Sequence, residues 1–162
     1  MRLRYRVGQF LRALTAPCVP APPPDLSPPL QALYMRMAPA DRAHALRTAA
    51  RVAQGAAVPP DLHAAALLHD AGKAGSAIHL WDRVAYVLLA RLAPTLLQRC
   101  RAPGLVALRE HAALGAADVA LAGASPILVG LIRHHHDDPA ALAWPAAQRD
   151  LLRRLQQADD ES

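Results

Sequence analysis

The stretch AALLHDAGK, residues 65–73, closes an apolar run with an imidazole, a carboxylate and the only lysine of the chain. The run of Ala and Leu predicts a buried segment, and His69 and Asp70 follow it directly. Burying these two side chains costs several kcal/mol unless something pairs with them. A metal cation would pair with both, so the stretch predicts a helix end that presents His69 and Asp70 to a metal ion.

The composition predicts an all-α fold. The chain has 162 residues, enough for one domain with a sizeable core. Hydrophobic residues, mainly Ala and Leu, make up 53% of it, whereas aromatic residues make up only 4%. Strands draw on Val, Ile, Thr and aromatic residues, so this balance favours packed helices over a sheet.

The charge pattern does not indicate a nucleic-acid binding module. The net charge is +5, and every basic residue except Lys73 is Arg. Abundant Arg, Ala and Pro are typical of a GC-rich genome, so the arginine count alone does not identify a partner. No basic run is interleaved with aromatic residues, and no helix-turn-helix or zinc-finger spacing is present.

The sequence favours a soluble cytoplasmic protein. Cys18 and Cys100 are too few for a disulfide framework and form no CxxC metal motif. The longest apolar stretches are shorter than the ~20 residues that a membrane span needs. The N-terminal MRLRYRVGQFLRAL carries arginines throughout, unlike a signal peptide.

The first 30 residues are expected to differ from the rest. Residues 3–14 have apolar side chains at helical spacing and arginines on the other side, which predicts an amphipathic helix. It can dock on the domain's own core or, alternatively, mark a membrane surface. Residues 16–29 hold seven prolines and predict an extended connector, with Pro-rich ligand recognition as the alternative. We therefore divide the chain into 1–30 and a domain over 31–162.

Helical segments are predicted along most of that domain. Asp41 is placed to cap a helix that runs to about Gln54, and Ser125 and Pro126 read as the cap and first residue of another. The predicted ranges are 41–54, 61–72, 78–91, 105–121, 126 to the histidine triplet 134–136, and 146 to the C-terminus.

Candidate metal ligands are spread over several of these segments. One histidine in a helix is more often a surface or core residue than a ligand. Helical bundles, however, build metal sites from side chains on facing helices, so ligands far apart in sequence can converge. The candidates are His44, His69, Asp70, His111, the triplet His134, His135 and His136, and Asp159.

The segments RAHALRTAARV, AALLHDAGK and LQQAD together resemble the HD-domain metal-dependent phosphohydrolase superfamily, whose signature is H…HD…D. The resemblance covers residues 40 to 160 and implies an HD-domain-like helical bundle. It also implies that the core metal ligands are His44, His69, Asp70 and Asp159, with Asp160 as a rival for the last place.

Two further segments resemble the HD-GYP branch of that superfamily. In REHAALGAADVAL a histidine precedes a glycine by four residues, and LIRHHHDDP resembles the branch's histidine pair followed by an acid. The resemblance implies that His111, His135 and His136 bind a second ion. The chain continues DDPAALAWP without a GYP tripeptide, which argues against specificity for cyclic di-GMP and leaves a two-metal centre. Imidazole and carboxylate ligands suit divalent Fe, Mn, Zn, Co or Ni, as one or two ions.

The function implied by the resemblance is hydrolysis of a phosphomonoester or phosphodiester, such as a nucleotide or signalling nucleotide, by attack of metal-bound water. Asp70 is the expected bridge between two ions, because one carboxylate offers two oxygens. Lys73 either contacts phosphate or caps its helix. The alternatives are a catalytically silent HD-fold module that binds a nucleotide or partner protein, and an enzyme that processes nucleic acid.

The remaining polar residues are assigned smaller roles. Successive helical residues differ by about 100° around the axis, so three adjacent histidines of a helix cannot share one face. We expect His135, and then His136, to be ligands and His134 to be exposed. Arg47, Arg51 and Arg133 can contact phosphate or lie in solvent, and His63 and His79 are expected at the surface.

Overall fold

The computed structural model describes residues 21–54, 57–76 and 78–162, and this part of the chain is helical without strands. The all-α prediction is therefore confirmed for it. The predicted helix over 3–14 and the first part of the Pro-rich connector lie outside the described residues. The helices are α2 Pro28–Arg36, α3 Pro39–Val52, α4 Pro60–Leu68, α5 Leu80–Leu92, α6 Pro94–Arg99, α7 Pro103–Leu121, α8 Pro126–Arg133 and α9 Ala146–Asp160, with short 3₁₀ turns at η1 Ala71–Lys73 and η2 Pro139–Ala141.

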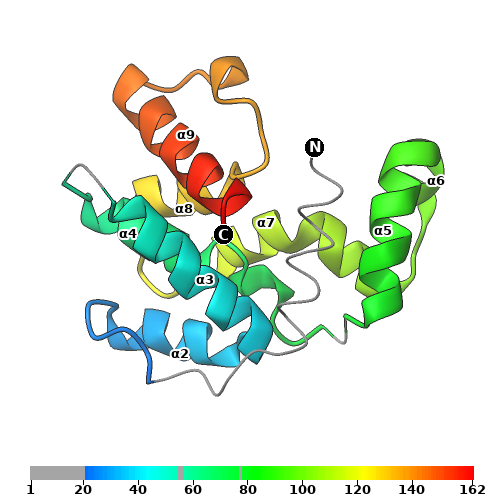
Figure 1. Cartoon of the computed structure of the whole chain (residues 1–162), viewed down its shortest axis with the longest axis horizontal. Helices are drawn as coiled ribbons and strands as arrows, with labels where there is room; N and C mark the ends of the chain where they lie inside the picture. The colour runs from blue at the N-terminus through cyan, green and yellow to red at the C-terminus, as the bar shows by residue number, and fades with distance from the viewer. Residues whose placement is uncertain (1–20, 55–56, 77) are drawn as a thin grey trace.

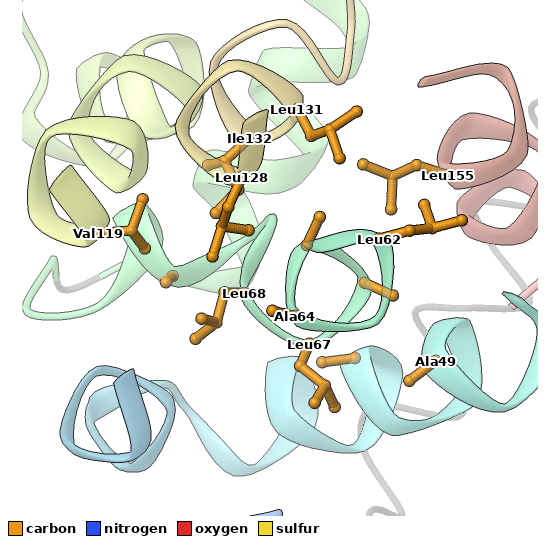
Figure 2. Close-up of a cluster of buried hydrophobic side chains, with 14 of the residues drawn as sticks. Ala49, Leu62, Ala64, Leu67, Leu68, Val119, Leu128, Leu131, Ile132 and Leu155 are labelled. Atoms are coloured by element: carbon orange, nitrogen blue, oxygen red, sulfur yellow. The ribbon is translucent and has the colours of Figure 1, made fainter. Parts of the chain in front are cut away.

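Helix α4 forms the centre of the hydrophobic core. Its leucines, Leu62, Leu67 and Leu68, are buried on different sides of the helix, as expected of a helix that is apolar all round. Figure 2 shows α3, α7, α8 and α9 contributing side chains around it. Because α4 is enclosed, its C-terminal end lies inside the molecule, and that end carries His69 and Asp70.

Helix α8 begins where the sequence predicts, whereas helix α3 does not. Ser125 caps α8, and its Oγ accepts a hydrogen bond from the Leu128 amide at 3.1 Å. The prediction that Asp41 caps α3 is wrong, because the helix starts earlier, at Pro39. Asp41 instead lies buried in the first turn, where Arg83 of α5 donates to its Oδ1 at 3.2 Å.

Helices α4 and α8 both end earlier than predicted, just before histidines that are candidate ligands. Helix α4 ends at Leu68, so His69 is its C-cap and Asp70 lies in the turn that leads to η1. Helix α8 ends at Arg133, and the histidine triplet forms a turn beyond it. The sequence also did not reveal α2 and α6 as separate helices. Both begin at a proline, and Pro28 lies within the segment 16–29 that we predict to be extended.

The α5–α6 pair lies at one end of the molecule. In Figure 1 these helices stand side by side and join the body through α7. Among the described residues, no helix combines the length and apolar composition needed to cross a membrane.

Candidate metal centre

In the described part of the chain, two groups of side chains could each hold a metal ion. The first consists of His44 from α3, His69 from the end of α4 and Asp159 from α9. The second consists of His111 from α7 with His135 and His136 from the turn after α8. Within each group the ligand atoms lie within 4.8 Å of one another. The structure therefore brings six of the seven predicted ligands into these two groups. The seventh, Asp70, belongs to neither group but lies beside both.

In the first group, a carboxylate oxygen lies between two imidazoles. Asp159 Oδ1 is 2.7 Å from His44 Nε2 and 3.4 Å from His69 Nε2. The ring of His69 is buried, and its Nδ1 donates to the Ala66 carbonyl at 3.1 Å. Its Nε2 is also buried but makes no hydrogen bond. Either a proton directed at Asp159, 3.4 Å away, or a cation held by both residues would satisfy this buried atom.

In the second group, unprotonated Nε2 atoms of the imidazole rings face one another. The Nδ1 atoms of His111 and His135 donate to the backbone carbonyls of Leu108 and Ile132, at 2.9 and 2.6 Å. Because a carbonyl can only accept, each neutral ring keeps its proton on Nδ1 and presents a lone pair at Nε2. The two Nε2 atoms are 3.2 Å apart, and His136 Nε2 is 3.1 Å from that of His111. Lone pairs at this distance repel unless a cation lies among them.

Asp70 lies between the two groups. Its Oδ1 is 3.4 Å from His111 Nε2, and its Oδ2 is 3.7 Å from His69 Nε2. Lys73 donates to Oδ2 at 2.5 Å, so the ammonium is held against the carboxylate that joins the groups. This arrangement fits a bridging carboxylate, with each oxygen directed toward one group.

The first group is strongly attractive to cations. Burial lowers the pKa of His69, but the charges of Asp70 and Asp159 outweigh it and raise that pKa to about 9. Burial also raises the pKa of Asp159, yet the His69 charge and the hydrogen bond from His44 hold it well below its usual range. Without a metal, a proton on His69 balances the two carboxylates, and a metal ion would replace that proton.

The second group keeps its imidazoles neutral. Burial, reinforced by the charge of Lys73, lowers the pKa of His111 to about 4. Burial and the neighbouring His136 likewise hold the pKa of His135 well below its usual range, and burial lowers that of His136. Neutral imidazole is the form that binds metals, so this group is ready to bind at neutral pH.

These opposite shifts predict that the metal-free protein is most stable near pH 6.5. Below pH 6.5 the unfolded chain protonates His111 but the folded protein does not until about pH 4, so stability falls as the pH falls. Above pH 6.5 the folded protein keeps the His69 proton up to about pH 9, so stability falls as the pH rises. Each change amounts to about 3 kcal/mol. Urea unfolding of chelator-treated protein at pH 4.5, 6.5 and 8.5 measures this, and a free energy of unfolding that rises steadily across the range would contradict it.

A hydroxyl pair joins α3 to the end of α9 near the first group. Thr48 Oγ1 donates to Ser162 Oγ at 3.1 Å and lies 3.2 Å from the His44 carbonyl. Ser162 Oγ in turn donates to the Ala158 carbonyl at 2.5 Å. Both side chains are buried. The pair therefore fixes the two segments that carry His44 and Asp159, a role that no motif in the sequence indicated.

Two glycines, Gly72 and Gly115, allow the turn that carries His69 and Asp70 to lie against α7. A Cβ atom on Gly72 would be 2.0 Å from the His111 carbonyl oxygen and 2.5 Å from the Gly115 nitrogen. A Cβ atom on Gly115 would be 3.0 Å from the Gly72 nitrogen. The sequence shows that Gly115 follows His111 by four residues. In the structure, the absence of a side chain on Gly115 lets the turn that carries Asp70 approach the backbone beside His111.

The other predicted candidates lie outside both groups. Asp160 is exposed, so Asp159 is the one of the pair that faces His44. His134 pairs with Asp137 at 2.7 Å and packs against Trp144, so it is half-buried rather than exposed. Four of the remaining five are accounted for as follows: His63 pairs with Asp25, exposed His79 directly precedes α5, Arg51 pairs with Glu161, and exposed Arg133 lines a cleft beside Trp144. Arg47 lies half-buried on α3.

Two residues of the triplet, His135 and His136, reach the second group, and the triplet is not helical. The expectation that three adjacent histidines cannot share one face assumes a helix, whereas the triplet forms a turn after α8. The rings of His135 and His136 lie 3.8 Å apart between centroids, and both reach the second group.

No protein family, curated protein or solved structure matches this chain.

Proposed function

We propose that the protein is a metal-dependent phosphohydrolase of the HD-domain type, which cleaves a phosphomonoester or phosphodiester such as a nucleotide or signalling nucleotide. The proposal rests on the resemblance to the H…HD…D signature together with the convergence of those residues. His44 and Asp159, which are 115 positions apart, lie within 2.7 Å of each other beside His69. Convergence over such a separation is what the signature requires.

The buried Nε2 atoms are the observation that carries the proposal. His69 Nε2 has no hydrogen-bond partner, and the Nε2 atoms of His111 and His135 face one another. Histidines kept only for packing would not direct two lone pairs at each other, as His111 and His135 do, since both lone pairs would remain unsatisfied. Metal ions, when bound, would polarise a phosphoryl oxygen and supply an activated water.

The chain's own residues have distinct roles in this proposal. The imidazoles and Asp159 hold the ions, and Asp70 holds the two groups in register through its separate oxygens. Lys73 donates to Asp70 and is partly exposed, so its remaining protons can reach a phosphate oxygen. The expected ions are divalent Fe, Mn, Zn, Co or Ni.

The test is to remove and restore metal in the purified protein. Elemental analysis should find one or two divalent transition ions per chain, and chelation should remove them. Each candidate ion would then be added back separately, and hydrolysis of p-nitrophenyl phosphate, bis-p-nitrophenyl phosphate and nucleotides measured. We expect turnover only in the metal-loaded protein.

Adjacent histidines supply a matched control. H135A should lose one ion and turnover, whereas H134A should retain both, because His134 faces Trp144 and Asp137. Equal metal content in the two variants would refute the assignment of the second group. A metal-loaded protein that binds nucleotides but hydrolyses none of the substrates would instead support a silent regulatory module.

A further inference from the structure

An apolar surface on α5 and α6 is not used by the candidate metal centre. Of the eight large hydrophobic side chains that are exposed in the described part of the chain, five belong to these two helices. No described side chain of α5 is buried, although the helix has 13 residues. We call this surface the α5–α6 face, and its members are Trp81, Val84, Leu88, Leu92 and Leu96.

The α5 members of this face form one stripe. At 100° per residue, Trp81, Val84, Leu88 and Leu92 lie within about 80° of one another around the helix axis. Trp81 is 77% exposed and Leu92 is 76% exposed, so both ends of the stripe are open. Isolated exposed leucines are ordinary, but a continuous stripe that includes Trp marks an interaction surface.

The opposite side of α5 faces the body of the protein. Arg83, about 140° around the helix from the middle of the stripe, donates to Asp41 of α3 at 3.2 Å. Asp82 accepts from the His79 amide at 2.7 Å, and a Cβ on Gly104 of α7 would lie 2.4 Å from its carboxylate. These contacts fix the rotation of α5, so the stripe points away from the core.

The charges around the α5–α6 face are positive. Arg91 adjoins Leu92, Arg99 lies one turn after Leu96, and Arg101 follows α6, and all three arginines are exposed. Asp82 is the only acidic residue between positions 78 and 102, and it is engaged with the α5 cap beside Gly104. A partner of this face must therefore be both apolar and anionic.

We propose that the α5–α6 face binds the surface of an anionic lipid bilayer. Trp and Leu side chains would enter the boundary between headgroups and acyl chains, and the arginines would contact anionic headgroups. A second copy of the chain fits less well, because it would bring another set of arginines to the same rim. This binding does not depend on the metal groups, whose residues come from other elements.

The test is vesicle flotation with the full-length protein. Vesicles of phosphatidylcholine alone are compared with vesicles that also contain phosphatidylserine. We expect binding only to the anionic vesicles, and binding that weakens as salt is raised. In a W144F background, the fluorescence of Trp81 should shift to shorter wavelength on binding, because Trp81 is then the only tryptophan.

Exposed residues provide variants that should fold normally. L88S/L92S should abolish flotation, whereas L121S, at an exposed leucine on α7, should leave it unchanged. R91Q and R99Q should each weaken binding about five-fold, and R153Q, on α9, should not. Metal content should be the same in all of these variants.

Three results would overturn the proposal. The first is equal binding to both kinds of vesicle. The second is binding to polyglutamate but to neither vesicle, which would assign the face to an acidic protein. The third is no vesicle binding together with a dimer, measured by light scattering, that L88S/L92S converts to a monomer.

Discussion

D70N is expected to lose both metal binding and turnover. Asparagine keeps the shape of the side chain but removes the charge, and an amide offers one oxygen where the carboxylate offers two. Asp70 lies near both groups, 3.4 Å from His111 Nε2 and 3.7 Å from His69 Nε2. Losing a bridging ligand removes several kcal/mol of transition-state stabilisation, so we expect kcat to fall roughly 1,000-fold or more. Elemental analysis and steady-state kinetics measure the two effects.

The matched control for this substitution is D160N. Asp160 is next to the candidate ligand Asp159 but is exposed, so its variant should keep wild-type metal content and kcat. Circular dichroism would establish that both variants are helical. Normal metal content and turnover in a folded D70N protein would rule out Asp70 as a bridge.

G72A is expected to destabilise the protein and weaken its metal centre together. The new methyl group would lie 2.0 Å from the His111 carbonyl oxygen and 2.5 Å from the Gly115 nitrogen. Both are backbone atoms of a 19-residue helix, so η1 and α7 must separate. Overpacking of this kind costs about 3 kcal/mol. Because His111 shares the displaced backbone, we also expect metal affinity to fall about 100-fold. Urea unfolding and metal titration measure these losses.

G75A separates crowding from backbone strain. Gly75 lies three residues later, and nothing is within 4 Å of the position where its Cβ would be. Its φ of +79° still disfavours alanine, at a cost of about 1 kcal/mol. G75A should therefore be mildly destabilised and keep its metal affinity. Equal losses in the two variants would mean that the contact between η1 and α7 has no special importance.

The sequence indicated which residues come together at the candidate site more accurately than it indicated the local structure around them. A buried His-Asp pair at a helix end follows from polarity alone, and the structure places His69 and Asp70 there. The choice between Asp159 and Asp160 could not be made from the sequence, because adjacent residues have the same chemistry. It depends on the rotation of α9, which the burial of Leu152 and Leu155 sets.

The features that the sequence did not predict depend on tertiary contacts. The early end of α8 lets His135 and His136 face the same group, and no proline or glycine within the triplet signals that end. The predicted helix 61–72 ends at Gly72, whereas the structure places Gly72 in η1, close to a helix that begins 31 positions later. Asp41 is predicted to be a helix cap because its actual partner, Arg83, is 42 positions away and the local sequence does not reveal it.

The first group also connects α3 with α9, since His44 and Asp159 are 115 positions apart in the sequence. An ion held by both would act as a removable cross-link, because α9 could not detach without breaking a coordination bond. The free energy of that local opening would then rise with the logarithm of the metal concentration. Resistance of the C-terminal helix to proteolysis would thus report metal availability in the surroundings, whether or not any substrate is present.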